Sequence, residues 1–316
     1  MALTGLDIYK LLPKTNCKKC GRPTCLAFAM QLAQKKANLS DCPDVSEDAK
    51  KVLGAAAEPP IKLVTIGSGA KKVEIGQENV LFRHEEKFYH PTGVAVTIND
   101  DLSDEAFSDR LKKLNSLKIS RVGTEIEIDL VAIINKSNNA EKFAEAAKKV
   151  SNGSHLSIIL SSASVDNMKA ALSNCAEKRP LIHGANSQNC EAMAALAKEN
   201  NCPMTVTATT LEELADLAER AKKTGVGEIV SDVSGNNPKE VLQKLTKVRR
   251  AALKKNFRAL GFPMITFVCD DDPFQEISLA STYLLKYAGI VAVNTCEPWG
   301  IMPLLTARAN IFTDPQ

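Results

Sequence analysis

The sequence lacks the features that mark several large classes of protein. No stretch of its 316 residues approaches about 18 uninterrupted apolar residues, so no segment is expected to span a membrane. The net charge is only +3 and no long Lys/Arg run occurs, which argues against nucleic acid as a partner. The first residues, MALTGLDIYKLLPK, do not have the layout of a secretory signal. We therefore expect a soluble, cytoplasmic protein.

Catalytic motifs are missing as well. The chain has no Gly-x-Ser-x-Gly elbow, no phosphate-binding loop and no dinucleotide fingerprint. Its four histidines lack the spacing of a zinc or non-haem iron site: His84, His90, His155 and His183. The composition, with 44% hydrophobic and 24% charged residues, is that of an ordinary globular protein. We predict a folded chain and assign no catalytic residue.

Cysteine is present, but unevenly. Of nine cysteines, four lie within the first 42 residues: Cys17, Cys20, Cys25 and Cys42. In a compartment that keeps thiols reduced, such a local group indicates a metal before it indicates disulfides. The other five occur singly and are predicted to be small buried residues; they are Cys175, Cys190, Cys202, Cys269 and Cys296.

The spacing of the four cysteines, C-x₂-C-x₄-C-x₁₆-C, favours a [4Fe–4S] cluster. Three thiolates on one tight loop can bind three irons of a cube, and a remote fourth closes the last corner. Gly21 permits the turn between ligands, and Cys25 falls in the first turn of a predicted helix, whose dipole favours an anionic cluster. Lys18, Lys19 and Arg22 could raise the cluster potential, attract an acidic electron donor, or be ordinary solvated charges.

Zinc is the main alternative for these cysteines. Structural zinc usually has two C-x₂₋₄-C knuckles, and the second half of this motif offers only Cys42. A purely structural or disulfide role is the third interpretation.

A domain boundary is indicated near residue 58. Residues 1–58 hold nine Lys/Arg against six Asp/Glu, whereas residues 59–316 hold 31 of each sign. The stretch Gly54-Ala-Ala-Ala-Glu-Pro-Pro60 then favours an extended connection, because proline stops a helix. We predict a cluster domain at 1–58, a linker and β-hairpin at 59–92 that caps the bottom of the next domain, and that domain at 93–316.

From residue 93 the chain repeats a strand–helix unit. Eight short apolar runs are predicted as strands: 93–99, 129–135, 156–162, 181–185, 203–208, 228–233, 264–270 and 289–295. Amphipathic stretches such as 139–151 separate them, with Phe143, Ala146, Ala147 and Val150 at helical spacing. Continuous apolar strands are typical of parallel sheets, and eight units match a (β/α)₈ TIM barrel. A doubly wound open sheet is the alternative.

Polar residues follow most of these runs, where a barrel carries its chemistry. These strand-end residues are Asn99, Asp100, Asn135, Asn186, Asp232, Asp270 to Asp272, and Asn294. They could bind a heterocycle or accept a partner's loops, or they could simply cap the following helices.

Three segments carry a resemblance to a known family. CKKCGRPTCLAFAMQLAQ followed by Cys42-Pro, VLFRHEEKFYHPTGVAV at 80–96, and VNTCEPWGIMPLLTARANIFTDPQ at 293–316 resemble the large (gamma) subunit of the corrinoid iron–sulfur protein. That protein belongs to the acetyl-CoA synthase/CO dehydrogenase (Wood–Ljungdahl) system of anaerobes. The resemblance covers the whole chain and the order of its parts. The family's large subunit continues into a C-terminal cobamide-binding domain, whereas the sequence stops at Gln316. We therefore assign no residue of this sequence to the cobalt, and expect the corrinoid of the complex not to be held by this chain alone.

The resemblance implies a role as a methyl carrier. The family's large subunit pairs with a small barrel subunit, and the heterodimer carries a corrinoid. Cobalt accepts a methyl group from methyltetrahydrofolate with the help of a methyltransferase, and passes it to acetyl-CoA synthase/CO dehydrogenase. The cluster, held by Cys17, Cys20, Cys25 and Cys42, takes electrons from a redox donor and returns Co(II) to Co(I).

Two other functions remain open from the sequence. One is a stand-alone pterin-binding barrel methyltransferase with a structural zinc site, suggested by the amide-rich strand ends. The other is a scaffold that only docks partners.

Overall fold

The computed structural model describes residues 5–33, 37, 39–46, 49, 53, 59–82, 84–121, 123–268 and 270–312. Two compact units divide the chain, residues 1–59 and residues 60–316. Most of the boundary segment 54–60 lies outside the described residues, as does Cys269. No helix in the described part is long and apolar enough to cross a membrane.

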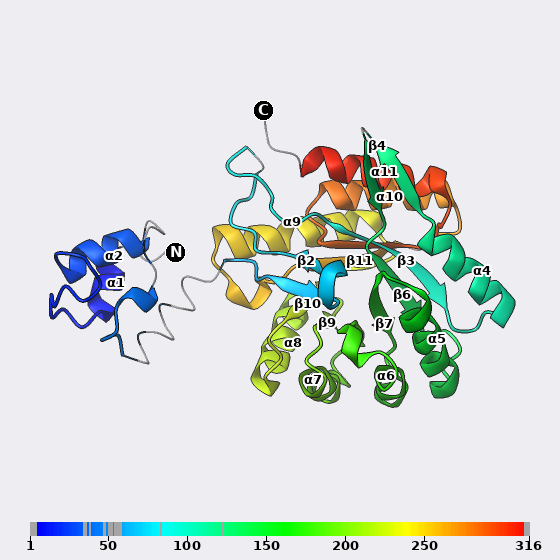
Figure 1. Ribbon diagram of the computed structural model, residues 1–316, viewed down its shortest axis with the longest axis horizontal. Helices are drawn as coiled ribbons and strands as arrows, with labels where there is room; N and C mark the ends of the chain where they lie inside the picture. The colour runs from blue at the N-terminus through cyan, green and yellow to red at the C-terminus, as the bar shows by residue number, and fades with distance from the viewer. Residues whose placement is uncertain are drawn as a thin grey trace. The chain divides into compact units, whose positions relative to one another are not determined.

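In the described part of unit 1, the helices α1 (Gly5–Leu11) and α2 (Cys25–Ala33) pack against each other (Figure 1). A single 3₁₀ turn, η1 (Leu39–Asp41), precedes Cys42. A small apolar core holds the unit together, and it includes Ile8, Leu12 and Phe28 together with the side chains of Cys25 and Cys42. Two of the four candidate ligands therefore lie within the core of the unit.

Unit 2 is a closed barrel of eight parallel strands. In spatial order they are β10 (Ile229–Asp232), β11 (Met264–Val268), β12 (Ile290–Val293), β3 (Gly93–Asn99), β6 (Leu130–Ile134), β7 (Ser157–Ser161), β8 (Leu181–Ala185) and β9 (Met204–Thr207). The first and last strands in the chain, β3 and β12, pair with each other, for example Val94 with Val291. The predicted fold class and all eight predicted strands are confirmed.

Helices cover the outside of this barrel (Figure 1). They are α4 (Asp104–Asn115), α5 (Ala140–Gly153), α6 (Val165–Leu172), α7 (Cys190–Glu199), α8 (Leu211–Thr224), α9 (Pro238–Lys254), α10 (Pro273–Leu285) and α11 (Pro298–Ile311). Short 3₁₀ turns occur at η2 (Gly69–Lys71), η3 (Ala176–Lys178) and η4 (Arg258–Leu260). The predicted apolar face of 139–151 is buried in α5.

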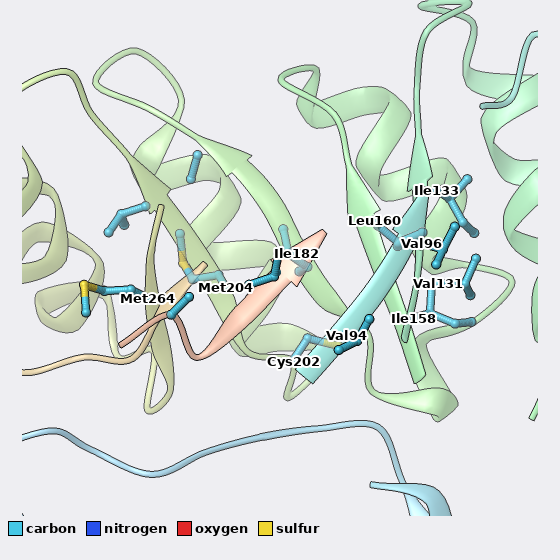
Figure 2. Close-up of a cluster of buried hydrophobic side chains, with 14 of the residues drawn as sticks. Val94, Val96, Val131, Ile133, Ile158, Leu160, Ile182, Cys202, Met204 and Met264 are labelled. Carbon is cyan, nitrogen blue, oxygen red and sulfur yellow. The ribbon is translucent and has the colours of Figure 1, made fainter. Parts of the chain in front are cut away.

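Both faces of the barrel strands are buried, which explains their continuous apolar runs. Figure 2 shows outward side chains such as Val94, Val96 and Ile158, which belong to the layer between strands and helices. Alternate residues such as Ala95 and Ile159 fill the inside of the barrel. Four of the singly occurring cysteines are buried, as predicted: Cys175, Cys190, Cys202 and Cys296.

Strands β1 (Val64–Ile66) and β2 (Val73–Ile75) form an antiparallel hairpin at the bottom of the barrel. Val64, Ile66 and Ile75 belong to the interior cluster of the barrel. At the start of β7, Ser157 donates from Oγ to the Lys71 carbonyl at 2.9 Å. Gly67 has a φ of +89°, and a Cβ there would lie 2.2 Å from that serine's Oγ, so glycine allows the close approach. The hairpin therefore fills the end opposite the strand-end residues.

A second hairpin was not predicted. Strands β4 (Lys118–Arg121) and β5 (Thr124–Glu127) pair between α4 and β6. Their residues are mostly exposed or half-buried, so KISR and TEIE give no apolar run. Arg121 holds this hairpin against α11 by donating to the Thr306 carbonyl at 3.2 Å.

Candidate metal centre

Two of the four predicted ligands are buried and two reach the surface. Cys17 is exposed and Cys20 half-buried in the loop between α1 and α2. Cys25 opens α2 and is buried, and Cys42 is buried just after η1. A metal group bound by all four would thus have one side in the core of unit 1 and one edge near solvent.

The loop before α2 has an unusual backbone. Lys14, Asn16 and Lys18 have φ values of 60°, 48° and 61°, in the left-handed region, and Gly21 has a φ of 73°. Only the glycine was predicted, because a side chain in this region costs about 1–2 kcal/mol. Strained residues of this kind cluster at functional sites, where the surroundings hold them in place. The backbone therefore marks this loop independently of its cysteines.

Asn16 fixes Cys25 from two sides. Its side-chain Oδ1 accepts a hydrogen bond from the Cys25 backbone N–H at 2.8 Å. Its own backbone N–H donates to Cys25 Sγ at 3.4 Å. Thr24 adds the usual N-cap, since its Oγ1 accepts from the Ala27 N–H at 3.1 Å. A backbone N–H aimed at sulfur stabilises a thiolate, so the bridge suits a metal-bound Cys25.

Asp44 connects the fourth cysteine to the first two. Its carboxylate lies 3.0 Å from Lys19 Nζ, and its Oδ2 accepts from Cys17 Sγ at 3.6 Å. Asp44 follows Cys42-Pro43, whereas Lys19 lies between Cys17 and Cys20. The hydrogen bond and charge of Lys19 lower the pKa of Asp44, so this carboxylate stays ionised. The ion pair is exposed and brings the remote ligand segment beside the loop.

Both burial and the other three cysteines act on the pKa of Cys42. Burial raises the pKa of Cys42, and the charges of Cys20, Cys17 and Cys25 raise it further. Four thiolates therefore need positive charge among them, which metal ions would supply.

Arg22 also suits a metal cluster at this site. Its Nε is buried, and no hydrogen-bond partner for it exists among the described residues. Arg22 lies between Cys20 and Cys25 in the sequence, and its free buried donor is of the kind that a cluster sulfur would accept from. Within the same described part of the chain, no three His, Cys, Asp or Glu side chains meet the geometry for holding a metal ion.

At the mouth of the barrel, several strand-end residues bond to groups on neighbouring strands and loops. Asp100 accepts from Asn135 Nδ2 at 2.7 Å and from the Ser137 N–H at 2.8 Å. Asn135 Oδ1 in turn accepts from Ser162 Oγ at 2.9 Å and Asn167 Nδ2 at 2.7 Å. The capping interpretation is wrong for these two residues, because their oxygens brace neighbouring strands and loops.

Among the remaining strand-end residues, one caps a helix and others bond to loops or to a neighbouring helix. Asp272 does cap its helix, accepting from the Phe274 N–H at 3.0 Å. Asn186 holds its own loop through the Gln188 N–H at 2.9 Å, and Asp270 accepts from Gln275 Nε2 at 3.0 Å. Asn294 Oδ1 accepts at 3.0 Å from Arg110, a side chain of α4 that also donates to the Thr97 carbonyl on the adjacent strand β3.

His183 and Asp232 form a buried pair that sequence reasoning missed. His183 Nε2 lies 3.0 Å from Asp232 Oδ2, and its Nδ1 lies 2.9 Å from Ser161 Oγ. Burial alone would raise the pKa of Asp232, but His183 and Ser234 outweigh it and lower that pKa. The partners are 49 residues apart on different strands, so no local pattern could have indicated them.

The mouth of the barrel has a cavity beside the His183–Asp232 pair. A cavity of about 530 Å³ lies over the ends of β10 and β11, and its lining includes Ser234, Phe267, Asp270, Asp271 and Gln275. Several of these polar groups are already engaged, since Ser234 bonds Asp232 and Gln275 bonds Asp270.

Comparison with known proteins identifies relatives along the whole chain. Residues 63–316 match the family described as "CO dehydrogenase/acetyl-CoA synthase delta subunit". Residues 12–43 match the family described as "Putative Fe-S cluster".

Two relatives illustrate the similarity. The corrinoid/iron-sulfur protein large subunit of Moorella thermoacetica is 42% identical over 316 residues, covering 100% of this chain and 71% of that protein. The acetyl-CoA decarbonylase/synthase complex subunit gamma of Methanothermobacter thermautotrophicus is 34% identical over 329 residues, covering 100% of this chain and 72% of the relative.

Two solved structures illustrate the likeness of fold. The 7,8-dihydropteroate synthase of Vibrio fischeri superposes with a TM-score of 0.53 at 12% identity, over 71% of this chain and 95% of its own. The Coxiella burnetii dihydropteroate synthase in complex with pteroic acid gives a TM-score of 0.54 at 14% identity, over 71% and 94%. At such identity the likeness shows a common fold and nothing of the chemistry.

Proposed function

This chain belongs to the family of corrinoid/iron-sulfur protein large subunits, and we propose that it is the cluster-bearing subunit of a corrinoid methyl carrier. The observation that carries the proposal is the four-cysteine motif of unit 1. Its residues Cys17, Cys20, Cys25 and Cys42 would hold a [4Fe–4S] cluster.

The complex would move a methyl group between two other proteins. Its corrinoid cobalt would accept the group from methyltetrahydrofolate through a methyltransferase and deliver it to acetyl-CoA synthase/CO dehydrogenase. A small barrel subunit would complete the heterodimer. We assign no described residue of this chain to the corrinoid and no catalytic residue.

When bound, the cluster supplies one-electron chemistry, which serves to return Co(II) to Co(I). The protein's part is to hold and tune the site. Asn16 donates its N–H to Cys25 Sγ, the Lys19–Asp44 pair holds the Cys42 segment in place, and the core of unit 1 keeps water from Cys25 and Cys42. Hydrogen bonds to sulfur and burial are the means by which a protein sets a cluster potential.

The barrel would serve as a docking body in this complex. The side chains of Asp100, Asn135 and Asp232 at the strand ends are engaged by neighbouring protein groups, which accounts for these three without a small-molecule substrate.

The test is the metal content of the full chain purified without oxygen. We expect about four irons per chain, little zinc and a broad absorption near 400 nm that bleaches on reduction. Stoichiometric zinc without iron would refute the redox role. Retention of four irons by a variant lacking Cys20 would refute the ligand assignment.

A further inference from the structure

The cavity at the mouth of the barrel has the size and the lining of a small-molecule site. Its volume of about 530 Å³ lies within the range of about 300–1,000 Å³ that is typical of ligand pockets. One wall is the loop after β10, from Ser234 to Asn236, and another is α10 with the loop that precedes it. Phe267, half-buried on β11, adds an aromatic ring to the lining.

The two loops of the cavity are braced by hydrogen bonds. Ser234 Oγ accepts from the Phe267 N–H at 2.8 Å, which ties the loop after β10 to β11. Asp270 accepts from the Asp272 N–H and from Gln275 Nε2, both at 3.0 Å, which fixes the loop before α10. A site whose walls are already ordered loses less conformational entropy when a ligand binds.

Tyr283 brings an unpaired hydroxyl to this cavity. Gln275, Leu279 and Tyr283 are four residues apart along α10 and all line the cavity, so they form one row on the helix. Tyr283 is only 3% exposed, and its hydroxyl makes no hydrogen bond among the described residues. The protein does not enclose this hydroxyl, so it opens into the cavity.

The direction and the protonation of this hydroxyl suit a ligand. Side chains on a helix lean toward its N-terminus, which for α10 is the mouth end where Asp270 and Asp271 lie. Burial raises the pKa of Tyr283, so the hydroxyl stays protonated and can both donate and accept.

The charge around the cavity is of one sign. Asp270 and Asp271 line it, and its described lining includes no Lys, Arg or His. Asp271 is exposed and accepts no hydrogen bond from a described residue. The N-termini of α9 and α10 offer little to an anion, because Asn237 and Asp272 already cap them. Carboxylates in a recess attract cations, and the face of Phe267 adds to this attraction.

We propose that this cavity binds a small organic cation. An ammonium or amidinium group pairs with the carboxylates of Asp270 and Asp271, an apolar body packs against Phe267, and the Tyr283 hydroxyl bonds a second polar atom of the ligand. No three acidic, His or Cys side chains in the described part of the chain are placed to hold a metal ion, so an organic cation fits the cavity better than a metal. The site does not depend on the cluster or on the proposed function.

The buried pair of His183 and Asp232 adjoins the same ring. The ring centroids of His183 and Phe267 are 4.6 Å apart. A ligand packed on Phe267 therefore changes the surroundings of His183, which gives the site a spectroscopic marker inside the barrel.

The test uses four probes of nearly one shape on the full chain. They are 4-hydroxybenzamidine, which is a cation, neutral 4-hydroxybenzamide, anionic 4-hydroxybenzoate, and benzamidine, which lacks the second polar atom. Binding is measured by calorimetry and by the nuclear magnetic resonance signals of the four tyrosines and four histidines. We expect 4-hydroxybenzamidine to bind with a Kd of about 1 mM or lower and to shift the signals of Tyr283 and His183. The amide and the carboxylate should bind at least about tenfold more weakly.

Three variants locate the site. Asp270→Asn/Asp271→Asn keeps both shapes, removes both charges, and should raise the Kd of 4-hydroxybenzamidine about tenfold at low salt and less at high salt. Tyr283→Phe should raise that Kd about three- to tenfold and leave the Kd of benzamidine within about twofold. The matched control, Asp101→Asn/Asp109→Asn, removes two partly or fully exposed carboxylates outside the cavity lining and should leave both Kd values within about twofold.

Four results would overturn the proposal. Equal Kd values for the amidine and the amide would show that charge does not select the ligand, and no binding by the folded chain would show that the cavity is no site. Binding that neither cavity variant weakens, or that leaves the Tyr283 signal unmoved, would place the cation elsewhere. Displacement of the amidine by Ca²⁺ would identify a metal site. The iron content of the chain, which tests the proposed function, is measured separately and is independent of all four.

Discussion

The Asn16 bridge allows a prediction that separates its two structural roles. Asn16→Gly removes the acceptor for the Cys25 N–H but keeps a residue that tolerates the left-handed φ of 48°. Losing one hydrogen bond at a partly buried donor costs about 1 kcal/mol. Asn16→Ala removes the same acceptor and adds about 1 kcal/mol of backbone strain.

Both free-energy costs destabilise unit 1, which is small. A domain of about 60 residues is marginally stable, so 2 kcal/mol changes the population of its open form by roughly 30-fold. We expect iron release to a ferrous chelator, measured anaerobically, to be faster by about fivefold for the glycine variant and about 30-fold for the alanine variant.

The critical result is the order of the iron-release rates of the unmodified chain, the glycine variant and the alanine variant. Equal release rates for the glycine and alanine variants would refute the strain argument. A release rate unchanged in both would refute the bridge between Asn16 and Cys25 as a support of the site. Thr15 is exposed and directly precedes Asn16, so it provides the control. Thr15→Ala should release iron at the rate of the unmodified chain.

Three further predictions concern the site and the barrel. Cys20→Ala should hold fewer than four irons, and an unchanged iron count and electron paramagnetic resonance spectrum would contradict its role as a ligand. Burial alone would raise the pKa of Glu127, but Lys71 and His155 outweigh it and lower that pKa to about 2. Its contribution to stability should therefore be complete above about pH 4.5 and disappear as the pH falls toward 2, as pH-dependent urea unfolding beside Glu127→Gln would show. Arg249→Met leaves a buried carboxylate unpaired and should destabilise unit 2 by about 3–5 kcal/mol in the same assay; a loss below 1 kcal/mol would contradict it.

The features of the fold that depend on a local sequence pattern could be predicted from the sequence. Strands buried on both faces must be continuously apolar, and each of the eight runs contains a barrel strand. The hairpin β4–β5 was not predicted because its residues are exposed or half-buried and give no continuous apolar run. The exact strand ends were set by the barrel's register, so the predicted runs extend beyond most strands by one or two residues.

The site was predictable only in part, for a physical reason. Cysteine spacing points to a metal because ligands must converge. Asn16, Asp44 and His183 act through partners 9, 25 and 49 residues away, and only the fold brings those partners together. Single polar residues without a local pattern carry no such signal.

The pairing of β3 with β12 has a consequence for how the chain is made. The barrel cannot close until its last strand has left the ribosome, whereas unit 1 is complete some 250 residues earlier. At 5–20 residues per second this interval is on the order of 10–50 s. We expect a nascent chain stalled before residue 290 to accept iron already, because all four candidate ligands lie in unit 1. Cluster insertion would thus not have to wait for the barrel to close.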